Sequence, residues 1–316
     1  MLRSLFAVLV LTLTPSVWSE EPPAKQPEKK PEEQKPAEVT KIPSRDEFLI
    51  LPLRVYRLRA EEFPAAHTKL EVADIERIIK KANRVWSYAG ITFGLESIRE
   101  AEADFASFAQ QRARAAEFAA RIAEREKGES KPEKKSGNST EPQEKKDPEA
   151  KQDAKPIEKE KEESARRELL AERNSRLFHA LIPGDTKLFD GFRVYYVQEF
   201  DVNGIYYGRR EAMVKATAAL RKVPDGIDEP IPRVTSHELG HGLGLPHRQD
   251  RTNLMQSGTT GTTLNEAEVK TTRAMAEKTP GLIRYKDLAS LIEKEQNAER
   301  KSLLTRWKEA VEEATK

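Results

Sequence analysis

The chain has 316 residues, of which 34% are charged and 37% hydrophobic, a balance that is poor for a sequence that is globular throughout. Lysine and arginine total 55 and aspartate and glutamate total 53, with both signs interspersed, so no basic surface for nucleic acid is expected. The absence of cysteine excludes disulfide bonds and tethering through a lipidated N-terminal cysteine.

Residues 1–19 have the pattern of a signal peptide. Arg3 precedes an apolar run from Leu5 to Leu13, and small residues flank Trp18. The run has about ten residues, whereas a helix that spans a bilayer needs about 20. We therefore expect cleavage before Glu20, an exported protein that is secreted or periplasmic, and no stable membrane span.

Two tracts rich in proline, lysine and glutamate, residues 20–44 and 127–156, are predicted to be disordered because they contain almost nothing apolar. The second tract lies between two segments with helical spacing of apolar residues, Ala101–Arg125 and Glu158–Leu181. These segments predict a charged helical hairpin inserted at residues 100–182, with the tract as its tip. The plainer alternative is two solvated helices without a special role.

A folded domain is expected over residues 45–316, outside the tip of this insertion. Leu49–Leu58 predicts a buried strand because apolar, β-branched and aromatic residues cluster or alternate there. The next segment, Leu70–Gly90, has an apolar face at helical spacing, and Gly90 is expected to end this helix. Ile91–Ile98 is expected to be a short second strand.

Two β-rich runs within residues 191–214 are separated by Asn203-Gly204, a dipeptide that favours a tight hairpin turn. We therefore expect an antiparallel strand pair there. Thr263 and Glu266 match a capping box, which predicts a helix to about Lys278, and Tyr285–Ala314 is expected to be largely helical.

Three of the five histidines lie in the segment HELGHGLGLPH, residues 237–247. On a helix, His237 and His241 lie on one face and can direct ring nitrogens to one ion. Gly244 can adopt a positive φ, reverse the chain and return His247 to the same point. Three neutral imidazoles in a tetrahedral arrangement suit Zn²⁺ and leave a fourth position for water, which predicts a catalytic site.

Glu238 is the expected general base. It follows His237 by about 100° around the helix, so it can reach the water without binding the metal. Zinc lowers the pKa of bound water toward about 7, and Glu238 can take its proton and pass it to a leaving amine. The expected activity is zinc-dependent hydrolysis of peptide bonds.

Glu266 or Glu268 could be a downstream carboxylate ligand, but His247 makes such a ligand unnecessary. His67 and His179 are interpreted as ordinary surface or helix residues. The alternative function is a non-catalytic, zinc-stabilised binding module that acts through the charged helical insertion. Glu238 argues against this alternative, because a purely structural zinc site needs no carboxylate beside the water position.

The segment HELGHGLGLPH resembles the His-Glu-x-x-His-x-x-Gly-x-x-His signature of the metzincin zinc peptidases, with the matrixin-like branch most similar. The resemblance implies an α+β, zincin-like fold with a twisted mixed sheet and an active-site helix. It also implies a methionine turn, with Met255 packed beneath the metal, and a protein or peptide substrate paired with an edge strand around Ile205–Gly208. Arg248 after the third histidine is not typical of the known branches, so the subfamily is unassigned. Ser257 replaces the tyrosine that serves some branches as an additional ligand.

Overall fold

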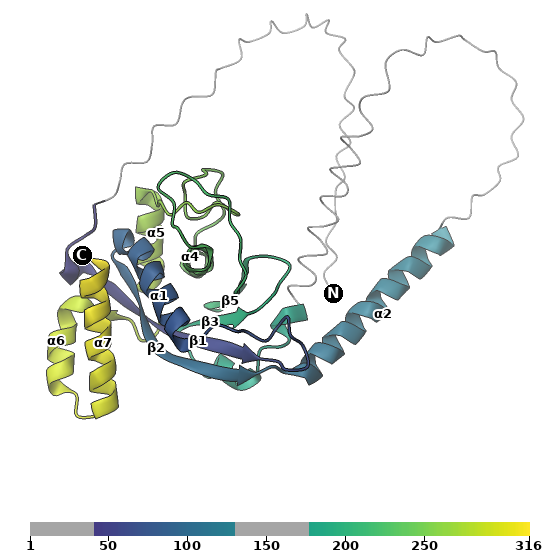
Figure 1. Ribbon diagram of the computed structural model, residues 1–316, viewed down its shortest axis with the longest axis horizontal. Helices are drawn as coiled ribbons and strands as arrows, with labels where there is room; N and C mark the ends of the chain where they lie inside the picture. The colour runs from purple at the N-terminus through teal and green to yellow at the C-terminus, as the bar shows by residue number, and fades with distance from the viewer. Residues whose placement is uncertain (1–40, 130–176) are drawn as a thin grey trace, which may run out of the picture. The chain divides into compact units, whose positions relative to one another are not determined.

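The computed structural model describes residues 41–129 and 177–316 (Figure 1). The predicted signal peptide lies outside the described residues. So do nearly all of the first low-complexity tract, the insertion tip from residue 130 and most of its predicted second helix. Within the described ranges, no helix is both long and apolar enough to cross a membrane.

A six-stranded mixed sheet forms the centre of the fold, with the main strand order β2-β1-β3-β5-β4. The first four of these strands run parallel to one another, and β4 is antiparallel to β5 and forms one edge. A short sixth strand, β6, pairs antiparallel with the start of β1. The bounds are β1 Leu49–Arg59, β2 Ile91–Glu102, β3 Phe192–Val197, β4 Gly204–Gly208, β5 Glu211–Lys215 and β6 Ile283–Arg284.

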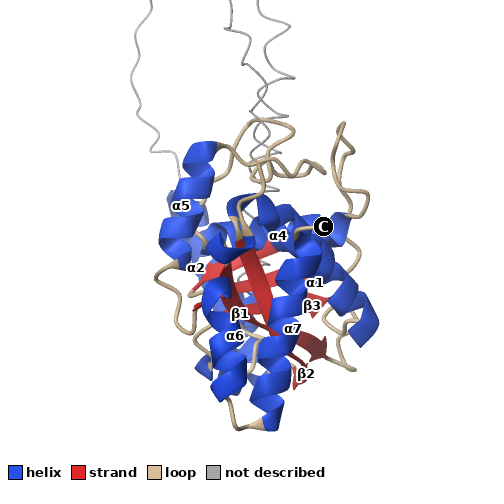
Figure 2. Cartoon of the chain, turned by 90° about the vertical axis from the view of Figure 1, so that its left-hand side faces the viewer, coloured by secondary structure: helices blue, strands red, loops and turns tan. Residues whose placement is uncertain are grey.

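Helices cover this sheet, as Figures 1 and 2 show. Side chains of α1 and α4 form one apolar core with β1, β2 and β3, whereas α6 and α7 enclose a smaller core with Phe48 and Ile50. Because both faces are covered, β1 is buried along almost its whole length, which explains its nearly continuous apolar sequence. The helices are α1 Val72–Trp86, α2 Phe105–Glu129, α4 Pro230–Gly242, α5 Glu266–Ala276, α6 Tyr285–Lys294 and α7 Ala298–Ala314.

Most of the expected elements occur close to their expected positions. The strand at Leu49–Leu58 and the amphipathic helix that follows it are confirmed as β1 and α1. Gly90 has φ 64° and lies between that helical region and β2, where the sequence placed it. Strand β2 is longer than expected because its second half continues to pair with β1.

Helix α2 confirms the first helix of the predicted insertion, and Figure 1 shows it extending away from the sheet. The base of the insertion is anchored on the opposite face of the sheet from α1. There Phe178 and Leu181 join a core with Tyr56 and Tyr195, and Phe105 packs against this core. The pairing of the two helices as a hairpin lies outside the described residues.

The predicted hairpin at Asn203-Gly204 is wrong. Strand β3 pairs with β1 and β5, and the hairpin joins β4 to β5 instead. Its turn residues are Arg209 and Arg210, with φ 49° and 58°. The Asn203 side chain is used elsewhere: its amide donates to the Ala219 carbonyl (2.9 Å), which ties the β3–β4 connection to a later loop.

The capping box before α5 is also displaced by two residues from its predicted position. Asn265, not Thr263, is the N-cap: its side chain accepts from the Glu268 backbone at 2.9 Å. The Glu268 carboxylate accepts in return from the Asn265 backbone at 2.9 Å. Asparagine is at least as good an N-cap as threonine, so Asn265 with Glu268 is favoured over Thr263 with Glu266. Helix α5 ends at Ala276, close to the expected end.

Candidate metal centre

The structure brings together the three histidines that the motif singled out. His237 and His241 lie one turn apart on α4, and Gly244, with φ 85°, reverses the chain after the helix. One ring nitrogen of each histidine, including His247, lies within 4.8 Å of those of the other two. The Nε2 atoms of His241 and His247 are 3.1 Å apart. Among the described residues, this is the cluster of side chains that could hold a metal ion.

Backbone carbonyls orient two of these rings. His237 Nδ1 lies 2.8 Å from the Leu254 carbonyl, and His241 Nδ1 lies 2.8 Å from the Leu245 carbonyl. A carbonyl can only accept, so each Nδ1 carries the proton and each Nε2 presents a lone pair. This is the usual outer-shell arrangement of a metal-binding histidine.

The protonation of these histidines also suits a metal. Burial lowers the pKa of His237 to about 3, and the Arg233 charge acts in the same direction. Burial also lowers the pKa of His241. Both rings are therefore uncharged near neutral pH, which is the form that binds metal. Three imidazoles suit zinc and also several other transition metals, so the donor set is compatible with zinc without selecting it.

Glu238 lies beside this cluster and is buried, with 5% of its surface exposed. Burial raises its pKa to about 8, although the Arg233 charge opposes the shift. Strand β4 begins directly over the carboxylate. A Cβ atom at Gly204 would lie 2.7 Å from Glu238 Oε1. The glycine therefore allows the edge strand to approach the carboxylate closely.

Met255 packs against α4, the helix that carries the first two histidines. Its side chain is fully buried, and a Cβ atom at Gly240 would lie 2.7 Å from its sulfur. The Met255 backbone accepts from the Arg248 amide at 3.0 Å, which connects this turn to the residue after His247. Met255 is thus connected both to α4 and to the segment that follows His247.

Arg233 is a site residue that the sequence did not reveal. Its guanidinium is buried and donates to the carbonyls of Gly261 (3.1 Å), Asn253 (3.3 Å) and Gln256. It lies 3.2 Å from His237 Nδ1, but that nitrogen has its shorter contact with the Leu254 carbonyl. Arg233 therefore fixes the loop 253–261 against α4. Its position four residues before His237, on the same helix face, is the signal that could have identified it.

A second connection holds the loop that carries His247. Arg248 Nε lies 3.1 Å from Glu268 Oε1, an ion-pair distance. The other oxygen of Glu268 accepts from the Asn253 side chain at 2.8 Å and from the Asn265 backbone. Glu268 is buried in this role, and neither it nor Glu266 joins the histidine cluster. The unusual arginine after the third histidine thus has a structural partner.

A cavity of about 700 Å³ opens over the histidines and Glu238. Its walls include β4, through Gly204, Ile205 and Tyr206, and apolar side chains from Val234 and Leu220. The outer edge of β4 pairs with no strand in the described part of the chain. The site thus combines a possible metal centre, a carboxylate and an open strand edge.

The sequence matches no model of a known protein family, and it matches no curated protein. The interpretation of the site therefore depends on its residues and their geometry.

Proposed function

We propose that this chain is an exported, zinc-dependent endopeptidase with the zincin-like fold of the metzincins. The observation that carries the proposal is the convergence of His237, His241 and His247 beside the buried carboxylate of Glu238. A site that served stability alone would need no carboxylate at that position. The parallel strands with one antiparallel edge strand, and Met255 under the site, are consistent with the metzincin resemblance.

The three histidines would hold zinc through their Nε2 atoms. When bound, zinc supplies Lewis acidity that activates water and polarises a peptide carbonyl. In its ionised form, which the charge of a bound metal would favour, Glu238 accepts a proton from the attacking water and delivers it to the amine that leaves. The carbonyls of Leu254 and Leu245 hold the rings of His237 and His241 in the required orientation.

Strand β4 would hold the substrate. An extended peptide can add to an exposed strand edge through backbone hydrogen bonds, whatever its side chains. The edge of β4 borders the cavity that contains the histidines, and Gly204 places the strand directly against Glu238. A peptide paired there would therefore pass over the carboxylate with a backbone carbonyl close to the metal position. This arrangement favours an endopeptidase that acts on unfolded or extended segments.

The test compares the wild type with Glu238→Gln, with Glu266→Gln as a matched control on the exposed start of α5. We expect both variants to bind one zinc per chain, and we expect only Glu238→Gln to lose hydrolysis of an unfolded protein substrate. Cleavage by Glu238→Gln at the wild-type rate would refute the assigned base. A wild type that binds zinc but cleaves no substrate would favour the non-catalytic binding module instead.

Export is a separate part of the proposal and has its own measurement. The protein is expressed in a host with a secretory pathway, and the N-terminus of the chain recovered outside the cytoplasm is sequenced. We expect it to begin at Glu20, after the apolar segment has been removed. A chain that stays in the cytoplasm with Met1 intact would refute this part and leave the site chemistry unaffected.

A further inference from the structure

The turn between β4 and β5 has an unusual sequence for its conformation. Its two central residues, Arg209 and Arg210, have φ 49° and 58°, and Gly208 pairs with Glu211 across the turn. Two-residue hairpin turns with positive φ at both positions favour Asn-Gly or Gly-Gly. A left-handed backbone is strained for arginine, because its Cβ atom crowds the carbonyl oxygen that follows. Two arginines at this place therefore suggest a use for their side chains.

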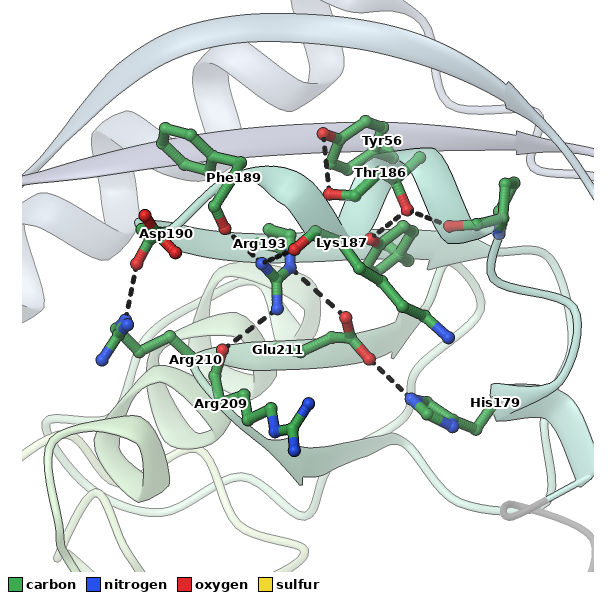
Figure 3. A network of polar contacts seen from close by, with 12 residues as sticks. Tyr56, His179, Thr186, Lys187, Phe189, Asp190, Arg193, Arg209, Arg210 and Glu211 are labelled. Carbon is green, nitrogen blue, oxygen red and sulfur yellow. Dashed lines mark hydrogen bonds and ion pairs between the residues drawn. The ribbon is translucent and has the colours of Figure 1, made fainter. Parts of the chain in front are cut away.

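The surrounding structure holds this turn firmly, as Figure 3 shows. The Arg193 backbone donates to the Arg210 carbonyl (2.8 Å), and the Arg193 guanidinium donates to the Arg209 carbonyl (3.1 Å). The Arg210 amide donates to the hydroxyl of Tyr206, a residue of the edge strand (3.1 Å). Backbone strain of this kind persists where neighbouring groups over-determine the conformation. The two arginine side chains are therefore presented from a fixed base.

The nearest buried carboxylate does not neutralise these arginines. Glu211 is balanced by Arg193, whose Nε lies 3.3 Å away, and it is hydrogen-bonded to His179 at 2.6 Å. Glu211, Arg193 and His179 thus form a network on the face of the sheet that also carries Tyr56 (Figure 3). The positive charge of the turn remains available to solvent.

The two arginines differ in how much of each side chain is engaged. Arg209 is exposed, and its guanidinium has no hydrogen bond or ion pair with any residue in the described ranges. Arg210 is half-buried and donates from Nε to the Asp190 carbonyl at 2.8 Å, which directs its side chain toward the start of β3 and away from the outer edge of β4. Asp190 is the acidic residue beside the turn, and its carboxylate forms no ion pair with a described residue. Exposed Lys187 adds a further positive charge on the same network.

We propose that Arg209 binds an acidic side chain of the substrate, so that the enzyme prefers peptides with Asp or Glu several residues N-terminal to the cleaved bond. This inference rests on the proposed function. The peptide would run antiparallel to β4, the slightly more stable pairing. Gly204 lies against Glu238, and β4 ends at Gly208, roughly 14 Å further along at ~3.4 Å per residue. The acidic residues would thus lie about four to six positions before the cleaved bond.

The test uses two peptides with a common cleavable centre, one with Glu and one with Gln at the fourth to sixth positions before the cleaved bond. Cleavage is compared for the wild type, for Arg209→Asn combined with Arg210→Gly, and for a control. The double variant introduces the pair that this turn favours, so it is expected to fold at least as stably as the wild type. The control, Lys286→Gln with Lys301→Gln, removes the same charge from exposed positions on α6 and α7.

We expect the wild type and the control to cleave the Glu peptide with a kcat/KM about threefold higher than that of the Gln peptide at low salt, because one exposed ion pair contributes modestly. The preference should vanish in the turn variant and shrink at roughly 0.5 M NaCl. Equal cleavage of both peptides by the wild type would refute the inference and leave the peptidase proposal intact.

Failure of the peptidase proposal would be recognised separately. If the wild type cleaves neither peptide, binding of fluorescently labelled peptides is measured by anisotropy on the zinc-loaded wild type and on the turn variant. Tighter binding of the Glu peptide that is lost in the turn variant would support the acidic site without hydrolysis. Equal affinities for the Glu and Gln peptides would overturn it.

Discussion

Replacement of Gly204 by alanine tests whether close approach of the edge strand to Glu238 matters for catalysis. The new Cβ atom would lie 2.7 Å from both Glu238 Oε1 and Val234 Cγ1, whereas ordinary contacts begin at 3.4 Å. Either β4 or the Glu238 side chain must therefore move by about 0.7 Å. Val234 limits movement toward the helix, so the carboxylate and the strand share the displacement. The change adds one methyl group and removes no hydrogen bond.

The expected loss of activity in Gly204→Ala follows from this displacement. A misplacement of about 1 Å in a reacting group can reduce the rate on the order of 100-fold, so we expect kcat/KM to fall roughly 10- to 100-fold. Overpacking of one methyl group costs about 1–3 kcal/mol. For a chain of this size, that corresponds to a decrease in Tm of roughly 2–10 °C. The atoms nearest to the new methyl group belong to Glu238 and Val234 and not to the histidines, so zinc content should be unchanged.

The assay measures kcat/KM on an unfolded substrate, zinc per chain and Tm for Gly204→Ala and for Gly184→Ala. Gly184 is a suitable control because a Cβ atom there would meet nothing within 4 Å and its φ is not positive. We expect the control to resemble the wild type in all three measurements. Wild-type activity in Gly204→Ala, at unchanged zinc content, would show that β4 does not constrain the Glu238 carboxylate as argued.

Three further predictions concern the metal centre and the network behind the edge strand. His247→Ala should lower zinc affinity by more than about 100-fold, measured by chelator competition, and should lower Tm in the presence of zinc. An unchanged number of zinc ions per chain would contradict a three-histidine site. Arg248→Met should lower zinc affinity by roughly tenfold by releasing the loop from Glu268, and a value within twofold of the wild type would argue against this role. Glu211→Gln should destabilise the protein by about 3 kcal/mol at pH 7, because it leaves Arg193 without its charge partner. The difference in Tm between the wild type and this variant should shrink as the pH falls below 4.5.

The surroundings of Glu211 determine how the stability loss in Glu211→Gln depends on pH. Burial acts to raise its pKa, but the His179 hydrogen bond and charge, together with the Arg193 and Lys187 charges, outweigh it and hold the pKa below the ordinary value of 4.5. A carboxyl group whose pKa is lower in the folded state stabilises the fold above pH 4.5 and loses that contribution as the pH falls through the lowered value. A stability difference between wild type and variant that grows toward low pH would refute this account.

The histidine cluster that could hold a metal was predictable from the sequence because its geometry is almost entirely local. His237 and His241 are brought together by one helical turn, and Gly244 needs only a positive φ to return His247. The roles of Arg233 and Glu268 were not predictable in the same way. Their partners are carbonyls and side chains 15–28 residues away in sequence, and their positions depend on how the loop folds back on α4.

The main helices and strands could also be predicted from the sequence, because the spacing of apolar residues in a helix differs from that in a strand. Strand β1 is an apolar run, and α1 has apolar residues at helical spacing, so each pattern favours one structure. Thr263 and Asn265 were harder to distinguish as N-caps because each has an acidic residue three positions later. Asn265 is selected because Glu268, its partner in the capping box, is buried and also accepts a hydrogen bond from the Asn253 side chain.

The error that matters most for function concerns the two ends of β4. By local preference, Asn203-Gly204 should form the turn and Arg209-Arg210 should lie in extended structure, and the structure reverses both. The glycine is used where the strand must approach Glu238, and the arginines occupy a turn that strains their backbone. Sequences generally agree with local rules except where a site imposes its own requirements. Both departures lie on the strand that we propose binds the substrate, one over the carboxylate and one where the acidic residues of the peptide would lie. These two departures from local preference therefore support the assignment of β4 as the substrate-binding edge.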